Sequence, residues 1–322
     1  MQKKLIVTPS PYGRDKSVST TRIMGDVVIA LLPTLAAAVW IFGWQALKVS
    51  VICVLTAVVA EWAYQKLTHQ RVTVGDLSAV VTGLILSFNL PATAPWWLCA
   101  MGSLLAIVLV KQIFGGLGSN FANPAMAARI ILMLSWLGVM NTMASPNTGA
   151  FWGVAGVDTV ASATPLAGAR TNGMLDSYSL LQLFFGVVPG MMGETCKATL
   201  LLGGIYLMVR RVIDWRLPLT FIGGVFLLSL IKWGSLQAAL YQILSGGLFL
   251  GAFFMATDYV TSPITKWGKV IGGLLAAVVL FAIRAAEKSS YPEGCSFAIL
   301  FMNIVTPFID RWTMPKTFGK EA

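Results

Sequence analysis

The sequence contains little charge for its length. Asp, Glu, Lys and Arg make up 11% of the 322 residues, whereas a soluble chain carries about 25%. Hydrophobic residues make up 57%, and the mean hydropathy is +0.76. The length alone would suggest two soluble domains, but so few charges cannot cover the surface of such domains. The composition therefore indicates a polytopic, all-α membrane protein.

Acidic residues are fewer than basic residues. The chain has 13 Asp and Glu against 23 Lys and Arg, which gives a net charge of +10. A basic chain can be a nucleic-acid-binding protein, but here the basic residues cluster in short loops between apolar runs. That distribution is the positive-inside pattern of membrane proteins, so we predict no nucleic-acid partner.

Cysteine is also rare. The four cysteines lie far apart in or beside apolar runs and form no CxxC pair, so their spacing indicates neither a zinc site nor a disulfide framework. Residues 1–19 are polar and lack the continuous apolar core of a cleavable signal peptide. We therefore predict no metal site and no removed leader.

Apolar runs dominate the rest of the chain. Several are shorter than the roughly 20 residues that a spanning helix needs, so they must borrow flanking residues or be broken. An eleventh piece, residues 180–192, is interrupted by Pro189-Gly190 and is typical of a re-entrant or interfacial segment. The ten candidate spans are residues 27–42, 49–64, 77–90, 96–110, 122–139, 195–209, 217–231, 238–256, 270–285 and 296–309.

The basic residues predict the orientation of these spans. With ten spans and the amino terminus inside, sixteen basic residues fall on the inner side and six on the outer side, while Arg129 lies within a span. Lys111 counts among the inner loop residues, and Lys197 and Arg284 count among the outer ones. This asymmetry predicts that both termini are cytoplasmic and that the loop at 141–178 faces outward.

Short stretches of sequence recur along the chain. Residues 83–86 match 247–250, residues 104–106 match 274–276, and residues 118–122 match 294–298. Five spans per copy would give two inverted repeats, an arrangement in which transporters place sites between broken helices. The predicted organisation is a cytoplasmic tail (1–24), a first five-helix repeat (25–140), an external loop with a re-entrant segment (141–192), a second five-helix repeat (193–310) and a cytoplasmic tail (311–322).

The longest polar gap surrounds one uncrowded threonine. Thr164 has small neighbours, Asp158 six positions before it and Pro165 directly after it, and the proline keeps the preceding backbone extended. A hydroxyl with an open approach and a nearby acid is what an enzyme would need to esterify the side chain with a phosphate. The alternative is an unmodified outer loop of small residues.

Two further segments carry polar groups that a flat heterocycle could use. Residues 115–125 (GGLGSNFANPA) combine glycines, which permit close backbone approach, with the amides of Asn120 and Asn123. No strand precedes them, so they are not a dinucleotide fingerprint. The related segment of the second copy contains Thr257 and Asp258. The alternative for each residue is a helix-capping turn.

Charged residues within apolar runs are candidates for an ion pathway. Glu61 and Arg129 lie inside runs, where ionisable groups are costly and often functional. Glu194 opens a run, with Lys197 three residues later on the same helical face. For Glu61 and Arg129 the alternative is a structural ion pair, and for Glu194 it is a helix cap against the dipole.

Nearly the whole chain resembles one family of membrane subunits. The resemblance includes Ser10-Pro11, Arg22-Ile23-Met24, the asparagine and threonine segments, residues 211–216 (RVIDWR) and Pro292-Glu293-Gly294. The family comprises the D subunit of the Rnf ferredoxin:NAD oxidoreductase complex and the B subunit of the sodium-pumping NADH:quinone reductase. The compact amino terminus favours the first of these, the Rnf component.

The resemblance implies two flavins. In the family pattern Asp-x-x-Ser/Thr-Gly-Ala-Thr, the last threonine carries FMN through a phosphoester, and that position here is Thr164, in a motif with Asp158, Ser162 and Ala163. Ala161 and Ser162 depart from the pattern, and both are small. The relatives also hold a non-covalent riboflavin toward the cytoplasmic side, which implies a second site near Asn120, Asn123, Thr257 and Asp258.

The implied function is that of a flavin electron carrier in a redox-driven translocase of the bacterial inner membrane. Electrons would pass from ferredoxin to NAD⁺ while Na⁺ or H⁺ crosses the membrane, with Glu194 and Glu61 as ion-pathway candidates and no catalytic side chain. The implied partners are other complex subunits, including a second flavin-bearing subunit and iron–sulfur subunits, a flavin transferase, and lipid. The alternatives are the quinone-reductase B subunit, a urea- or ammonium-type channel, and a scaffold with a vestigial motif.

Overall fold

Helices make up all the regular structure in the described part of the computed structural model, which covers residues 19–144, 146, 166, 178–194, 196–286 and 294–314. The elements of the amino-terminal part are α1 (Thr20–Phe42), α2 (Trp44–Leu67), η1 (Val74–Asp76), α3 (Ser78–Phe88), α4 (Trp96–Leu104), η2 (Leu105–Gln112), α5 (Pro124–Ser135) and α6 (Leu137–Met140). Those of the remaining part are α8 (Leu180–Phe185), α9 (Lys197–Val209), α10 (Arg216–Trp233), α11 (Leu236–Leu244), α12 (Leu248–Leu250), η3 (Gly251–Met255), α13 (Lys266–Ala285) and α14 (Cys295–Thr313).

Each of the ten predicted apolar runs contains a helix, but the helices differ in length. Four of them, α1, α2, α10 and α13, are long and apolar enough to cross a membrane, and α11 with α12–η3 makes a fifth if the bent pair counts as one span. The helices α3, α5, α9 and α4–η2 are apolar but shorter. The first helix begins at Thr20 and the last ends at Thr313, so both extend beyond the predicted bounds of the helical regions.

Side chains at the helix ends account for several of these boundaries. Ser19 accepts a hydrogen bond from the backbone N–H of Arg22 at 3.2 Å and so caps α1, as a serine at this position commonly does. Gly43, with φ 72°, separates α1 from α2. Thr265 accepts from the backbone N–H of Gly268 at 2.9 Å and caps α13.

One predicted span is broken in its middle. The helix pair α11 and α12–η3 bends by 66° at residues 245–247, where Gly246 has φ 68°. The guanidinium of Arg284 donates to the carbonyl oxygens of Gln242 at 2.6 Å and Ser245 at 3.2 Å. Arg284, which the charge count placed on the outer side, is buried, because the break after α11 needs donors for its free carbonyls.

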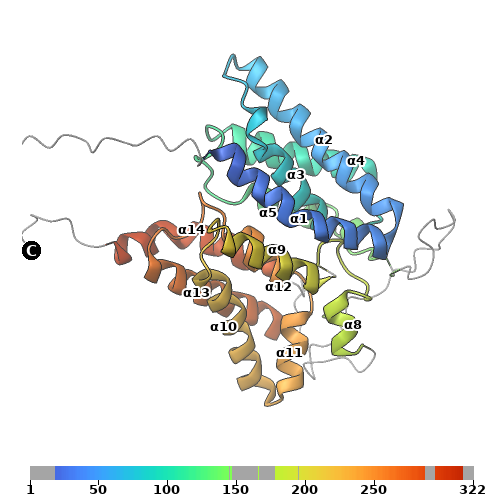
Figure 1. Cartoon of the computed structure of the whole chain (residues 1–322), viewed down its shortest axis with the longest axis vertical. Helices are drawn as coiled ribbons and strands as arrows, with labels where there is room; N and C mark the ends of the chain where they lie inside the picture. Colours follow the sequence, from blue (N-terminus) through green and yellow to red (C-terminus); the bar gives the residue numbers. More distant parts are fainter. Residues whose placement is uncertain are drawn as a thin grey trace, which may run out of the picture.

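The helices form two groups that meet along two contacts. Figure 1 shows α1–α5 on one side and α9–α14 on the other, with α1 packed against α9 and α5 against α14. Within the first group α2 packs on α3 and α4, and within the second α10 packs on α11 and α13. The largest apolar cluster includes residues from both groups, among them Leu31, Leu86, Leu207 and Phe254.

The interrupted segment after α8 packs against the end of α3. The backbone N–H of Gly193 donates to the carbonyl of Phe88 at 2.9 Å, and that of Met192 donates to the carbonyl of Leu90 at 3.3 Å. A Cβ on Gly193 would lie 2.2 Å from the Cβ of Phe88, so only glycine permits this approach. The segment is therefore a short helix followed by buried turns.

We predict that Gly203→Ala destabilises the contact between α9 and α1. The new Cβ would lie 2.3 Å from the carbonyl oxygen of Ala30, and overpacking of this kind costs about 1–3 kcal/mol. The apparent melting temperature of the purified protein in detergent should fall.

Gly223→Ala in α10 is the matched control. A Cβ there has nothing within 4 Å, and alanine is the better helix former, so the melting temperature should stay the same or rise slightly. Equal effects of both substitutions would contradict the close packing of α9 on α1.

Candidate functional site

Two π-helical segments precede the loops that carry the predicted polar motifs. In η2 and η3 the backbone bonds span five residues, as in Gly116 N–H to the carbonyl of Lys111 at 3.0 Å and Ala256 N–H to the carbonyl of Gly251 at 2.7 Å. Such π-bulges occur frequently at functional sites. The loop after η2 carries Asn120 and Asn123, and the loop after η3 carries Thr257 and Asp258.

These four predicted residues line a single cleft, which we call the asparagine cleft. Asn120, Asn123, Thr257 and Asp258 come together from loops far apart in the sequence. The cleft holds about 750 Å³ of empty space, including its open mouth. Most of its wall is apolar, with contributions from Val27, Val81, Ile85, Leu207, Phe253 and Phe254.

The two asparagines of the asparagine cleft differ in how many hydrogen bonds they form within the protein. Asn123 caps α5, since its Oδ1 accepts from the backbone N–H groups of Ala125 at 3.1 Å and Met126 at 3.3 Å. Its Nδ2 donates to the carbonyl of Met255 at 3.4 Å. Asn120 is 8% exposed, and its buried Oδ1 has no hydrogen-bond partner among the described residues. An unmet buried acceptor is costly, so Asn120 is the position with free capacity for a ligand.

Asp258 and Thr257 stand at the end of η3. The Thr257 hydroxyl donates to the carbonyl of Phe253 at 2.6 Å. Asp258 accepts from the hydroxyl of Thr261 at 3.3 Å. Although the residue is partly exposed, its carboxyl group is surrounded by protein, and this desolvation raises the pKa of Asp258 against the opposing effect of the Thr261 hydrogen bond. The Asp258 carboxyl is therefore easier to protonate than an ordinary aspartate.

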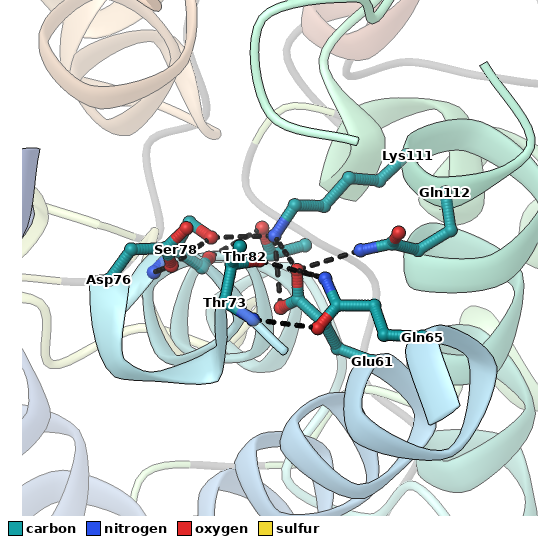
Figure 2. Close-up of polar contacts among 8 residues, drawn as sticks. All are labelled: Glu61, Gln65, Thr73, Asp76, Ser78, Thr82, Lys111 and Gln112. Atoms are coloured by element: carbon teal, nitrogen blue, oxygen red, sulfur yellow. Dashed lines mark hydrogen bonds and ion pairs between the residues drawn. The ribbon is translucent and has the colours of Figure 1, made fainter. Parts of the chain in front are cut away.

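A buried ion pair lies beside the asparagine cleft. The Nζ of Lys111 lies 2.8 Å from Oε1 and 3.0 Å from Oε2 of Glu61, and it also donates to the hydroxyl of Ser78 at 2.6 Å (Figure 2). The Nε2 of Gln112 donates to Glu61 at 2.7 Å, and that of Gln65 lies 3.5 Å from the same oxygen. The carboxylate is thus surrounded by donors.

The backbone before α3 holds Ser78 in place. Ser78 donates through its hydroxyl at 2.5 Å and through its backbone N–H at 2.8 Å to Oδ1 of Asp76 (Figure 2). Between them, Leu77 has φ 65°, a conformation that costs a non-glycine residue about 1–2 kcal/mol. Backbone strain of this kind persists only where the surroundings impose it, often at functional sites.

The second predicted acidic residue forms another buried cluster. The Arg129 guanidinium lies 2.9 Å from Oε1 of Glu194 and donates to Oδ1 of Asn89 at 2.6 Å. Glu194, Arg129 and Asn89 are all buried. Glu61 and Arg129 are therefore both in ion pairs, which is the structural alternative that their positions within apolar runs left open.

The predicted roles of Glu194 and Lys197 in a helix start need correction. The helix α9 begins at Lys197, so Glu194 lies in the preceding turn and does not open the helix. The buried Lys197 ammonium donates to the backbone carbonyl of Glu194, while the Glu194 carboxylate pairs with Arg129. Lys197 is therefore not an exposed outer-loop charge, because it satisfies a carbonyl that the turn leaves free.

The residues predicted around the covalent flavin lie outside the described residues. These are Asp158, Ser162, Ala163 and Thr164.

The pattern of apolar runs did not reveal the role of Lys111 and its neighbours. Lys111 was assigned to an inner loop, but it is 1% exposed and belongs to η2. Gln65, Gln112, Ser78 and Asn89 were not singled out, and all are buried. One signal was present: a glutamate inside an apolar run requires a buried cation, and Lys111 directly follows the run at 96–110.

Comparison with known proteins defines the class to which this arrangement belongs. Residues 6–319 match the NQR2, RnfD, RnfE family, so the chain belongs to that family. Together with the apolar helices, this identifies a multi-pass membrane protein.

Three relatives within this family are all D subunits of ion-translocating oxidoreductase complexes. The chain is 45% identical over 318 residues, covering 98% of this chain and 95% of the relative, to the D subunit of the Na⁺-translocating ferredoxin:NAD⁺ oxidoreductase complex of Acetobacterium woodii. It is 39% identical to the proton-translocating counterpart of Clostridium ljungdahlii, covering 97% and 96%. It is 36% identical to the D subunit of the ion-translocating oxidoreductase complex of Alcanivorax borkumensis, covering 99% and 98%. These relatives are subunits of a redox enzyme complex, as the sequence predicted.

We predict that Glu194→Gln strongly destabilises the protein. It leaves the Arg129 guanidinium buried without its carboxylate, and loss of one partner of a buried pair costs about 3–5 kcal/mol. Thermal unfolding in detergent should show a large fall in melting temperature, which Glu194→Gln/Arg129→Met should partly restore.

Asp214→Asn is the control for this prediction. Asp214 pairs with Lys269 and Arg216 at 3.2 Å, but all three side chains are partly exposed, so its loss should cost about 0–1 kcal/mol. A similar cost for both single substitutions would contradict the buried character of the Glu194 pair.

Proposed function

We propose that this chain is the D subunit of an ion-translocating ferredoxin:NAD⁺ oxidoreductase complex. In this proposal it carries flavins and passes electrons within the membrane part of the complex. The observation that carries the proposal is the agreement of full-length similarity to such subunits with a cleft that gathers the four residues predicted for flavin binding. The other subunits, including flavin-bearing and iron–sulfur subunits, are its proposed partners.

The asparagine cleft suits an uncharged flavin ring. Its walls are apolar, and the buried Oδ1 of Asn120 lacks a donor that a heterocyclic N–H would supply. Lys111 is the single cationic side chain among the described lining residues, and Glu61 neutralises it. A phosphate in the cleft would therefore be desolvated without a counter-ion, so we propose riboflavin here. When bound, riboflavin would supply one- and two-electron chemistry.

A covalent FMN on Thr164 is the second part of the proposal. Its support is the Asp158-to-Thr164 motif, the uncrowded hydroxyl and the family membership. A flavin transferase would make the phosphoester during maturation. Electron transfer weakens steeply with distance, so a flavin on the outer side requires a further centre between it and a cytoplasmic donor. The asparagine cleft provides a place for that centre.

We further propose that the helices form ten spans in two inverted five-helix repeats, with cytoplasmic termini in the bacterial inner membrane. In its support, α3 and α12 contain one pair of matching stretches, α4–η2 and α13 contain the second, and the third begins just before α5 and α14. The order of packing also agrees, because α2 contacts α3 and α4 as α10 contacts α11 and α13.

Glu61 and Glu194 remain proposed positions of an ion pathway. Each is paired with a protein cation, Lys111 or Arg129. A coupling ion could therefore bind at either carboxylate only by replacing or displacing that cation, which would tie ion binding to a change in the surrounding charges.

We predict that Thr164→Ala abolishes covalent flavin, because the phosphoester needs the threonine oxygen. Intact-mass analysis of the chain purified from its native membrane, with flavin fluorescence of the denatured gel band, measures this. Thr171→Ala is the control and should keep both signals. Retention of flavin in Thr164→Ala, or its mapping to Thr159 or Thr171 by peptide analysis, would show that the assigned residue is wrong.

We predict that Asn120→Leu lowers the flavin that acid extracts from the complex while leaving the Thr164 adduct intact. The leucine removes the one unmet acceptor of the asparagine cleft without touching a helix cap. Asn123→Leu should also lower extractable flavin, but it removes the cap of α5 and so tests stability as well. Asn141→Leu, at an exposed position after α6, is the control. Unchanged extractable flavin in Asn120→Leu would contradict the site.

A further inference from the structure

Lys111 belongs to two environments at once. It lines the asparagine cleft, as does Ser78, yet its ion-pair partner Glu61 is not among the lining residues. The three N–H groups of the ammonium match three contacts, to Oε1 and Oε2 of Glu61 and to the hydroxyl of Ser78. Lys111 is thus the charged connection between the cleft and Glu61.

A second cleft is lined by Gln65 and Gln112, both of which contact Glu61, and we call it the glutamine cleft. It has about 1120 Å³ of empty space, including open solvent, and its lining includes Gln65, Gln112, Thr73, Asp76 and Arg71. The amides of Gln65 and Gln112, which hold the Glu61 carboxylate, therefore also face this polar and open cleft. Glu61 is 0% exposed, and the two glutamines that contact it also line the cleft.

Stability alone gives no reason for a charged pair at this place. Replacing a buried ion pair by apolar residues of similar volume is often neutral or stabilising. Here the pair also requires Ser78, Asp76 and the left-handed conformation of Leu77 to complete its hydrogen bonds. A charged group retained between two clefts under these conditions is suited to respond to charge in one of them.

Because the cation is a lysine, the ion pair with Glu61 can rearrange more easily than one made by an arginine. A lysine ammonium is a compact charge on a flexible stem with rotatable donors, whereas an arginine holds a carboxylate through a fixed planar fork. The Ser78 hydroxyl is a second hydrogen-bond acceptor for Lys111, and it donates its own hydrogen bond to Oδ1 of Asp76 at 2.5 Å. Lys111 can therefore lean from Glu61 toward the cleft without losing all its hydrogen bonds.

From this geometry we propose that Lys111 is shared between Glu61 and negative charge in the asparagine cleft, so that reduction of a flavin there is linked to cation uptake at Glu61. The inference rests on the proposed function. As charge arrives in the cleft, the Lys111 ammonium moves toward it, and the carboxylate of Glu61 is left with the amides of Gln65 and Gln112. A cation entering through the glutamine cleft then replaces the ammonium.

The charges balance in this exchange. One electron, supplied from reduced ferredoxin through the complex, brings one negative charge into the asparagine cleft. One proton or one Na⁺ at Glu61 brings one positive charge. When the electron passes on toward NAD⁺, Lys111 returns to Glu61 and the cation leaves. Lys111 and Glu61 are thus positioning residues, since the electron resides on the flavin.

Other ionisable groups face the two clefts and define what must be controlled. Among the described lining residues these are Arg71 and Asp76 in the glutamine cleft, and Asp258 and Tyr259 in the asparagine cleft. Asp258 is the group whose protonation could imitate cation uptake, because its pKa is raised by desolvation. Asp258→Asn therefore accompanies the Glu61 variant in the test.

The experiment measures the reduction potential of the cleft flavin in the purified complex. Spectroelectrochemical titrations are run against pH at fixed Na⁺ and against Na⁺ at fixed pH, in the Thr164→Ala background. The cleft flavin is the component that Asn120→Leu removes. We expect Lys111→Met to lower the reduction potential of the cleft flavin by at least about 59 mV, which is a tenfold change in the one-electron equilibrium constant. We expect Glu61→Gln to abolish the cation dependence that wild-type Glu61 confers.

Matched variants separate this role from general effects of charge. Lys269→Met removes another paired lysine, which lies 3.2 Å from Asp214 and is not among the lining residues of either cleft, and should leave the potential unchanged. If Lys111→Met does not assemble, Lys111→Met/Glu61→Gln removes both buried charges together and should show a lowered potential without cation dependence. Dependence on pH alone identifies the proton as the cation, and dependence on Na⁺ identifies sodium.

Three results would overturn the proposal. An unchanged potential in Lys111→Met, or in the double variant, would show that Lys111 does not sense charge in the cleft. Cation dependence that survives Glu61→Gln but disappears in Asp258→Asn would place the uptake at Asp258. Absence of any extractable flavin in the wild-type complex would instead overturn the proposed cleft flavin, and this inference with it.

Discussion

Burial of charge in a largely apolar protein is the constraint on which this structure depends. A lone charge in such surroundings costs several kcal/mol, so each buried cation recruits acceptors, in three cases from a distant segment. Lys111 reaches α2, Arg129 reaches the turn before α9, and Arg284 reaches the break after α11, whereas Lys197 finds its carbonyl acceptor three residues away. These contacts connect helices whose apolar surfaces alone would allow many relative positions.

The same constraint arranges the candidate site. Asn123 both caps α5 and donates a hydrogen bond to the carbonyl of Met255 at the end of η3. The polar groups of the cleft are therefore mostly consumed in holding helix ends together. Among the described residues that line the cleft, the amide oxygen of Asn120 is the buried side-chain atom without a hydrogen-bond partner. Most of the other lining residues are apolar. We propose that such a site suits a flat and mostly uncharged ligand.

The sequence predicted the helices well because each apolar run is a local property, and all ten runs contain one. It also predicted which polar loops converge, since Asn120, Asn123, Thr257 and Asp258 share a cleft, although their pairing depended on a resemblance and a repeat. The partners of the buried charges could not be predicted in this way. Glu61 and Lys111 are 50 residues apart, and the charge count placed Lys111 in an inner loop without a partner residue. Glu194 was likewise matched with its sequence neighbour Lys197, when the acceptor that Lys197 needed was a backbone carbonyl.

The guanidinium at the break between α11 and α12 has a consequence for the permeability of the membrane. A broken helix exposes carbonyl oxygens, and in hydrocarbon these would draw in water. Arg284 donates to two of them from a buried position, so a side chain takes the place that water would otherwise fill. The helix break can then lie inside the membrane without a chain of water molecules through the protein. The relatives of this chain are subunits of ion-translocating complexes, and in such a complex a leak through a subunit would discharge the ion gradient.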